Sequence, residues 1–147
     1  TAVQNKIAEA LQKQAFVQFF DEAMRHADEV WAAEETLLSL LWQGEIVGPP
    51  AGPSMTVPAD LDLYAGVSSA AKWDAFVPRL AEALTALGWS GCFFTERAER
   101  IAAGWPVGEE LECVLTEGGA VVHARLRRYV ILDSGTRRVL SPTGAAD

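Results

Sequence analysis

The segment EELECVLTEGGAVVHARLRRYVIL, residues 109–132, is the strongest indication of the fold. Apolar and polar side chains alternate on both sides of Gly118-Gly119, which is the period of a strand with one buried face. Two adjacent glycines suit a tight hairpin turn, because its central residues need positive φ. The segment therefore predicts a β-hairpin with strands over 109–116 and 120–132.

The chain before this hairpin predicts a mixture of strands and helices. Alternation over 61–67 indicates a half-buried strand, and the apolar face that follows indicates a helix ending before Gly88. Residues 89–94 are typical of a short buried strand, so 61–94 can form a β-α-β unit with one parallel strand pair. A short helix is expected over 95–103.

The N-terminal 43 residues contain neither glycine nor proline and predict helix. One helix of this length would measure about 65 Å, which exceeds the diameter of a small globule. We therefore expect a break near Asp28, with Asp28 as the N-cap of a second helix and the two helices forming a hairpin. Apolar residues at helical spacing define the expected buried stripe: Val3, Ile7, Ala10, Val17, Phe20, Met24, Ala27 and Trp31.

These elements predict one α+β domain of 147 residues. The helical hairpin of residues 1–43 and two further helices would pack on a small, mainly antiparallel sheet. Residues 44–60, rich in proline and glycine, are expected to be a connector. Residues 61–141, which end with a strand over 136–140, would form the α+β core, and residues 142–147 a loose tail.

The charge of the chain narrows the classes of partner. The formal net charge is −8, and residues 1–60 hold nine acidic and three basic side chains. An acidic protein repels phosphate backbones and anionic lipid, so nucleic acid is an unlikely partner and no membrane association is expected. An acidic helical surface either solubilises the protein or contacts a basic partner.

Cysteine usage and the N-terminal sequence bear on the compartment. Cys92 and Cys113 stand in apolar surroundings, and a chain of this length does not need a disulfide, so buried free thiols are expected. Residues 1–20 carry no apolar stretch typical of a leader. We therefore predict a cytoplasmic protein.

The chain carries five of its twelve basic residues within fourteen positions near the C-terminus: Arg125, Arg127, Arg128, Arg137 and Arg138. An arginine cluster on neighbouring strands can bind phosphate, carboxylates or nucleic acid. Alternatively, these arginines pair with the acidic residues of the facing strand, namely Glu109, Glu110 and Glu112. The sequence leaves both interpretations open.

Three arrangements with catalytic or metal-binding potential are incomplete. The segment 88–92 lacks the last glycine of a nucleophile elbow. A thiol triad of Cys92, His123 and Asp133 needs a proximity that spacing does not establish. The set Glu22, His26 and Glu29 follows one helical face, but no Glu-x-x-His motif accompanies it. We predict no catalytic, cofactor-binding or metal-binding residue.

The leading hypothesis is a non-enzymatic protein-binding module, such as an adaptor, inhibitor, chaperone or immunity-type protein. Its partner would be another protein, or a second copy bound through residues 1–43. One alternative is a winged-helix DNA-binding regulator that uses helix 95–103 and the arginine-rich hairpin. Another is a small enzyme or ligand binder with a pocket between helices and sheet. The candidate interaction residues are Asp21, Glu22, Asp28, Glu29, Trp31, Trp105, Arg125, Arg127 and Arg128.

Overall fold

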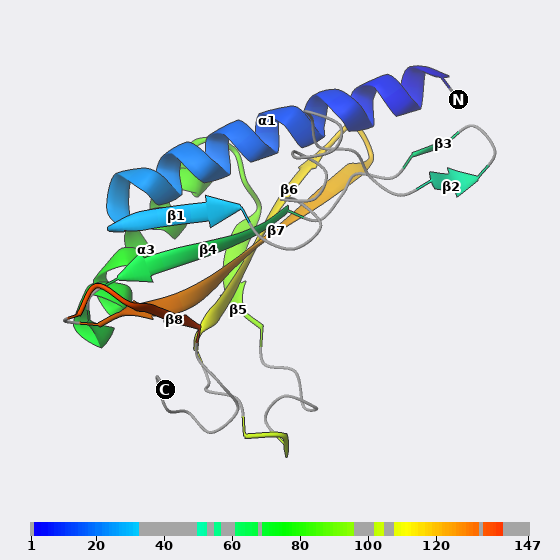
Figure 1. The fold of residues 1–147 in the computed structure, drawn as a ribbon. Coiled ribbons are helices and arrows are strands. Elements are labelled where there is room, and N and C mark those ends of the chain that lie inside the picture. The colour runs from blue at the N-terminus through cyan, green and yellow to red at the C-terminus, as the bar shows by residue number, and fades with distance from the viewer. Residues whose placement is uncertain are drawn as a thin grey trace.

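The computed structural model describes residues 2–32, 50–52, 55–56, 61–67, 69–95, 102–104, 108–132 and 134–139. The fold is α+β, as predicted (Figure 1). The helices and strands are α1 (Ala2–His26), β1 (Glu29–Ala32), β2 (Pro50–Gly52), β3 (Met55–Thr56), β4 (Leu61–Val67), α3 (Ala70–Ala86), β5 (Gly91–Phe94), β6 (Glu110–Glu117), β7 (Ala120–Ile131) and β8 (Arg137–Val139). Within these ranges, neither helix combines the length and the apolar content needed to cross a membrane.

The main sheet has the strand order β1-β4-β7-β6-β5, and β8 pairs with the far end of β7. Its pairs are antiparallel apart from β4 and β7, so the predicted mainly antiparallel sheet is confirmed. The expected pairing within the β-α-β unit is wrong. The strands β4 and β5 lie at different places in the sheet with β7 and β6 between them, and the parallel partner of β4 is β7.

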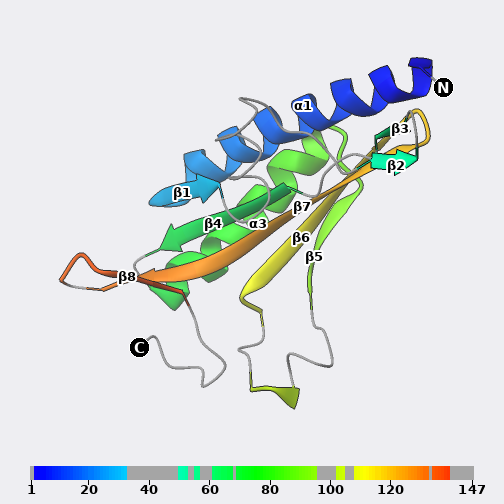
Figure 2. The ribbon, with the colours of Figure 1, turned by 45° about the vertical axis from the view of Figure 1, so that its right-hand side comes forward.

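Both helices pack on one face of the sheet, as Figure 2 shows. The strand residues on this face are buried and apolar: Leu61, Leu63, Ala65, Val67, Leu111, Cys113, Leu115, Val122, Ala124 and Leu126. Because successive strand residues point to opposite faces, the intervening residues lie on the face away from the helices. We call that second surface the far face of the sheet.

The predicted hairpin forms the centre of this sheet. The turn between β6 and β7 holds Gly118 and Gly119 at φ of 60° and 82°, values that non-glycine residues rarely adopt. The β6–β7 pairing continues in register to Arg127, opposite Glu110. Alternation in the sequence therefore located the two central strands correctly.

Helix α3 ends before Gly88, as its sequence predicts, and its start is capped by Ser69. The Ser69 hydroxyl accepts a hydrogen bond from the Lys72 amide at 3.1 Å and caps the first turn. After the helix, Gly88 has a φ of 96°. The Trp73 side chain is buried, and its indole N–H donates to the Gly108 carbonyl at 2.9 Å. This bond connects α3 to the start of β6.

The expected N-terminal helical hairpin is not found as predicted. The chain bends at Ala27-Asp28, close to the expected break, but the next residues form strand β1 rather than the first turn of a second helix. β1 pairs with β4, and the Asp28 amide donates to the Gly66 carbonyl at 3.1 Å. Residues 33–43 lie outside the described part of the chain. Pairing with β4 outweighs local helix propensity in this segment.

Two further strand predictions need correction. The connector 44–60 was expected to lack regular structure, but β2 and β3 form a small antiparallel sheet within it. Strand β5 was expected to be buried, yet it lies at the sheet edge with half of Phe93 exposed. The helix predicted over 95–103 and the tail 142–147 lie mostly or wholly outside the described residues.

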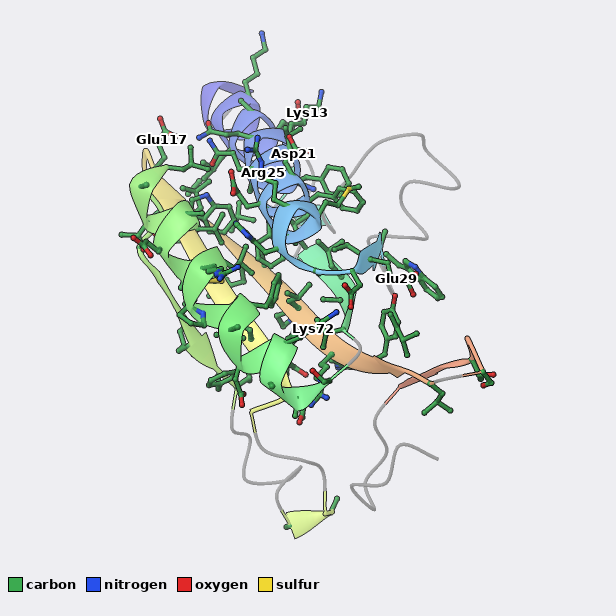
Figure 3. All side chains as sticks on the ribbon, turned by 90° about the vertical axis from the view of Figure 1, so that its left-hand side faces the viewer. Lys13, Asp21, Arg25, Glu29, Lys72 and Glu117 are labelled. Atoms are coloured by element: carbon green, nitrogen blue, oxygen red, sulfur yellow. A yellow bond between two sulfur atoms is a disulfide. The ribbon has the colours of Figure 1, made fainter. Side chains whose placement is uncertain are left out.

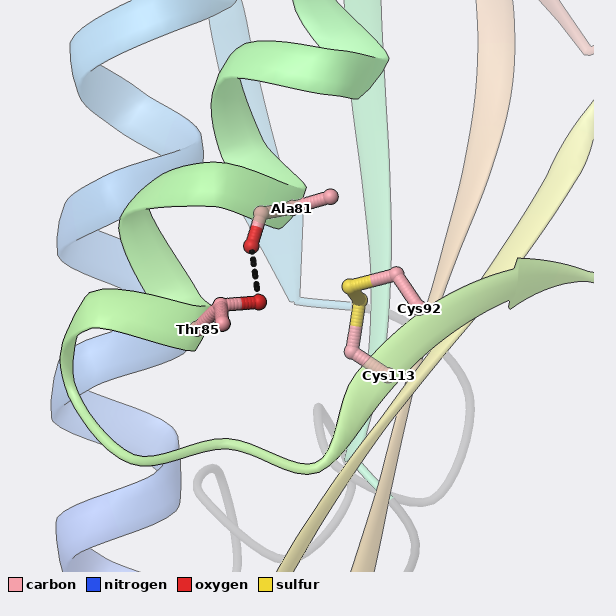
Figure 4. Close-up of a disulfide and its surroundings, with 4 residues drawn as sticks. All are labelled: Ala81, Thr85, Cys92 and Cys113. Atoms are coloured by element: carbon pink, nitrogen blue, oxygen red, sulfur yellow. Dashed lines mark hydrogen bonds between the residues drawn. A yellow bond between two sulfur atoms is a disulfide. The ribbon is translucent and has the colours of Figure 1, made fainter.

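The expectation of free thiols is wrong, because Cys92 and Cys113 form a disulfide (Figure 4). The two residues are directly opposite each other on β5 and β6, with their Cα atoms 4.1 Å apart. The bridge lies under the last turns of α3, where the Thr85 hydroxyl donates to the Ala81 carbonyl at 2.8 Å. Structural disulfides are typical of oxidising compartments, so the cysteines no longer support the predicted cytoplasmic location.

Candidate functional site

The surface of α1 that faces away from the sheet is the first candidate site. The buried side of α1 repeats every four residues through Leu11, Ala15, Phe19 and Ala23. The stripe expected from the sequence is therefore wrong, because Val17 and Met24 lie on the opposite side of the helix. Their exposed fractions are 56% and 54%.

Two aromatic side chains on one flank of α1 pack against the core and leave part of their surface beside Val17 and Met24. Phe16 and Phe20 are half-buried, and their ring centroids lie 5.5 Å apart. Together with Val17 and Met24 they form what we call the α1 strip. Four apolar side chains within nine helical residues give a continuous surface of the kind that packs against a partner helix or groove.

Charged side chains divide the outer surface of α1 into two halves. Lys6 and Lys13 are exposed on the N-terminal half, and Asp21 is exposed on the C-terminal half. Figure 3 labels Lys13 and Asp21 along the helix. Asp28 follows at the bend, where its carboxylate lies 3.7 Å from Lys72 Nζ. Glu9 and Arg25 are exposed as well and carry the opposite sign in each half of the helix. The change from basic to acidic therefore holds for the line of Lys6, Lys13 and Asp21.

Another predicted residue, Glu22, lies on the flank of α1 rather than on the strip. Its carboxylate oxygens lie 3.7 Å from Arg25 Nε and 3.9 Å from His26 Nε2. These contacts are between residues three and four positions apart, which adjoin on a helix surface. Glu22 therefore has partners within its own helix.

The far face of the sheet is the second candidate site, and Trp31 and Tyr129 form one end of it. The ring centroids lie 5.2 Å apart, and the Tyr129 hydroxyl donates to Glu29 Oε1 at 2.5 Å. Gly66 lies beneath the tyrosine, where an added Cβ would approach the ring to 2.4 Å. Trp31 keeps 47% of its surface exposed, whereas Tyr129 is buried.

The arginine cluster divides between the two faces of the sheet. Arg127 lies on the far face, where its Nε donates to Glu110 Oε2 at 3.1 Å. Arg128 points to the helix side, where its Nη1 donates to both carboxylate oxygens of Glu109 at 3.1 Å. Arg125 lies opposite Glu112 in the β6–β7 register. The register thus favours the second interpretation, in which these arginines pair with acidic residues on β6.

Further contacts give the far face mixed charge. His123 Nδ1 lies 3.6 Å from a Glu112 oxygen. Strand β7, which would form part of the wing in the DNA-binding alternative, lies inside the sheet between β4 and β6. Among the described side chains of β7, Arg127 and Arg128 lie beside carboxylates, which weakens them as contacts to phosphate.

The structure brings only some of the nine predicted interaction residues together. Glu29, Trp31, Arg125 and Arg127 share the far face, whereas Arg128 lies on the helix side. Asp21 and Glu22 lie on α1 and Asp28 at its end, while Trp105 lies outside the described residues. The exposed apolar residues Val17 and Met24 were not predicted as site residues. The sequence does carry a signal for them, because a second set of apolar residues follows helical spacing and could form the buried side instead: Leu11, Ala15, Phe19 and Ala23.

The catalytic and ligand-binding arrangements receive little support from the described residues. The disulfide removes Cys92 as a thiol nucleophile. No group of three metal-binding side chains was found among residues that the structure describes. A cavity of about 320 Å³ lies between α1 and the β6–β7 turn, lined by Ala10, Leu11, Gln14, Glu117 and Gly118. Neither histidine lines it, so it lacks the expected pairing of histidine and carboxylate.

Comparison with known proteins supplies no functional assignment. No protein-family model matches the chain, and no curated protein matches its sequence.

Proposed function

We propose that this chain is a protein-binding module whose contact surface is the outer face of α1. The observation that carries the proposal is the exposure of Val17 and Met24 on a helix whose opposite side is fully packed. Large apolar side chains that gather on one surface are typical of protein interfaces, whereas single exposed ones are common everywhere. Asp21, next to Val17 and Phe20, supplies a charge at the rim of this apolar surface.

The proposal refines the acidic helical surface inferred from the sequence. The net charge of −8 favours solubility and disfavours association with nucleic acid. Binding would draw its energy from the α1 strip, and the surrounding charges would select the partner and its orientation. No step of this function needs a cofactor or a reacting group.

A comparison of purified baits tests the proposal. The tagged protein, a Val17→Asp/Met24→Asp variant and a Val121→Asp variant are each used to capture proteins from the native host. Val121 is 41% exposed but lies on β7, so its variant controls for adding an acidic group elsewhere. We expect the parent and the control to capture the same protein. The α1 variant should capture at least tenfold less of it, because burying an aspartate without a partner is costly.

Circular dichroism and thermal unfolding must first show that the α1 variant is folded. A parent bait and an α1 variant that capture the same proteins in equal amounts would contradict the proposal. A captured untagged copy of this chain counts as a partner.

A further inference from the structure

We infer that the outer face of α1 binds the same face of a second copy, with the two helices antiparallel and the two-fold axis beside Val17. This inference rests on the proposed function and names its partner. It follows from the order of charged and apolar residues along the exposed surface of α1.

Exposed charges of opposite sign lie at equal distances in sequence before and after Val17, including Glu9 and Arg25, which are each eight residues from it. Lys13 and Asp21 are each four residues from Val17, and Lys6 and Asp28 are each eleven residues from it. All four side chains are exposed, and the three that belong to α1 lie on its outer side. Basic and acidic groups therefore stand at matching distances before and after the same residue.

An antiparallel arrangement converts this order into complementary contacts. A two-fold axis at Val17 places Lys13 of one copy in the same layer as Asp21 of the other, and Lys6 near Asp28. A parallel arrangement would place like charges together instead. Each pair occurs twice in the dimer, so the charges select the antiparallel orientation. Asp28 would keep its Lys72 neighbour and gain a second cation.

The apolar residues of the surface match in the same register. Ala10 and Met24 are each seven residues from Val17, so the long Met24 side chain of one copy meets the small Ala10 of the other. Spacings of seven residues keep side chains on one seam of a pair of packed helices. The two Val17 side chains meet at the axis, with Phe20 beside them. Between Lys6 and Met24, both within α1, the seam is about 27 Å long.

Light scattering during size-exclusion chromatography tests the association. We expect the parent protein to have a concentration-dependent mass that approaches that of a dimer, and the Val17→Asp variant to stay monomeric. Asp21→Lys and Lys13→Asp each place like charges in two layers, so each should weaken the dimer about tenfold or more. High salt should reduce the difference between these variants and the parent.

Charge exchange tests the orientation. The Lys13→Asp/Asp21→Lys double variant restores opposite charges in the antiparallel dimer and should bind itself about as tightly as the parent. An equimolar mixture of the two single variants should also dimerise. If the single variants dimerise as well as the parent, the proposed pairing is wrong. It is also wrong if the double variant forms a dimer no tighter than those of the single variants.

Cross-linking locates the two-fold axis. Both native cysteines are already paired with each other, so a Val17→Cys variant carries one free thiol. We expect this thiol to form an intermolecular disulfide readily, since a residue on the axis meets its own copy. Thr85→Cys, on an exposed turn of α3, is the matched control and should cross-link far more slowly. Equal rates would overturn the location of the axis.

The two proposals fail in different ways. A parent protein that stays monomeric at every accessible concentration overturns the self-association. If the α1-dependent capture of another protein persists in that case, the protein-binding function stands with a different partner. If neither experiment depends on α1, both proposals are wrong.

Discussion

The outer face of α1 and the far face of the sheet differ in how their charged groups are satisfied. On the far face, Arg127 and Glu110 form an ion pair at 3.1 Å, with Glu110 only 6% exposed. On α1, Lys6 and Asp21 are exposed. Val17, which lies between them in the sequence, and Met24, which follows Asp21, are exposed as well. The described charges of the sheet surface lie beside opposite charges of the same chain, whereas Lys6 and Asp21 on the helix point outward. Both surfaces expose large apolar side chains, Trp31 and Phe93 on the sheet and Val17 and Met24 on the helix.

This difference separates residues that stabilise the fold from residues available for contact. The arginine cluster is the densest group of basic residues in the sequence, but strand pairing brings Glu112 and Glu110 opposite Arg125 and Arg127. The α1 surface has fewer charges, and their order along the helix matters more than their number. Substitutions on the sheet should therefore reduce the free energy of unfolding, while substitutions on α1 should reduce association.

Among the charged residues of the sheet, the largest effect on stability is expected for Glu109→Ala. Arg128 has 10% of its side chain exposed and donates to both Glu109 oxygens, so losing this carboxylate leaves a nearly buried cation without its carboxylate partner. We expect a loss of about 3 kcal/mol in the free energy of unfolding, measured by urea titration. Glu117→Ala, on the exposed end of the same strand, should change it by less than about 0.5 kcal/mol. Equal effects for the two variants would remove the distinction between paired and outward-facing charges.

An intermediate effect is expected for Gly66→Ala. The new methyl group would meet the Tyr129 ring, which is held by its contact with Trp31 and its bond to Glu29. We expect a loss of about 2 kcal/mol in the free energy of unfolding, with a change in tryptophan fluorescence as the ring moves. The same substitution in a Tyr129→Ala background should cost little, since the clash is absent. A full cost in that background would show that Tyr129 is not the cause.

The smallest effect on stability is expected for Val17→Ala. More than half of the Val17 side chain is exposed, and alanine favours helix slightly more than valine does. The free energy of unfolding of the monomer should therefore stay within about 0.5 kcal/mol of the parent. Phe19→Ala is the matched control two residues away, because Phe19 is completely buried and should cost about 4 kcal/mol. A large loss for Val17→Ala would place this residue in the core and remove the basis for the interface.

The sequence predicted local elements better than it predicted the side of α1 that is buried. Period-two alternation located β4, β6 and β7, and the two glycines located their turn, because these signals act between near neighbours. In α1, two apolar stripes compete. The stripe predicted from the sequence contains large side chains such as Phe20 and Met24. The stripe that is buried in the structure includes Ala15 and Ala23, whose small size lets the helix approach the sheet closely.

Contacts between distant residues account for the other errors. The disulfide depends on β5 lying beside β6, which no local pattern reveals. The bond from Tyr129 to Glu29 joins residues one hundred positions apart. Glu29, Trp31, Arg125 and Arg127 were predicted as candidates separately, but their shared face follows from the parallel pairing of β4 with β7.

That parallel pairing has a consequence for the order of folding. Leu61 of β4 lies opposite Ala124 of β7, so about sixty residues must be made before the pair can close. The β6–β7 hairpin needs only a two-glycine turn and can close first, giving β4 and then β1 an edge on which to assemble. During synthesis, α1 leaves the ribosome long before β7 and has no sheet on which to pack. Its buried apolar side, and not only its outer one, is therefore open to chaperones or to premature self-association until the last third of the chain arrives.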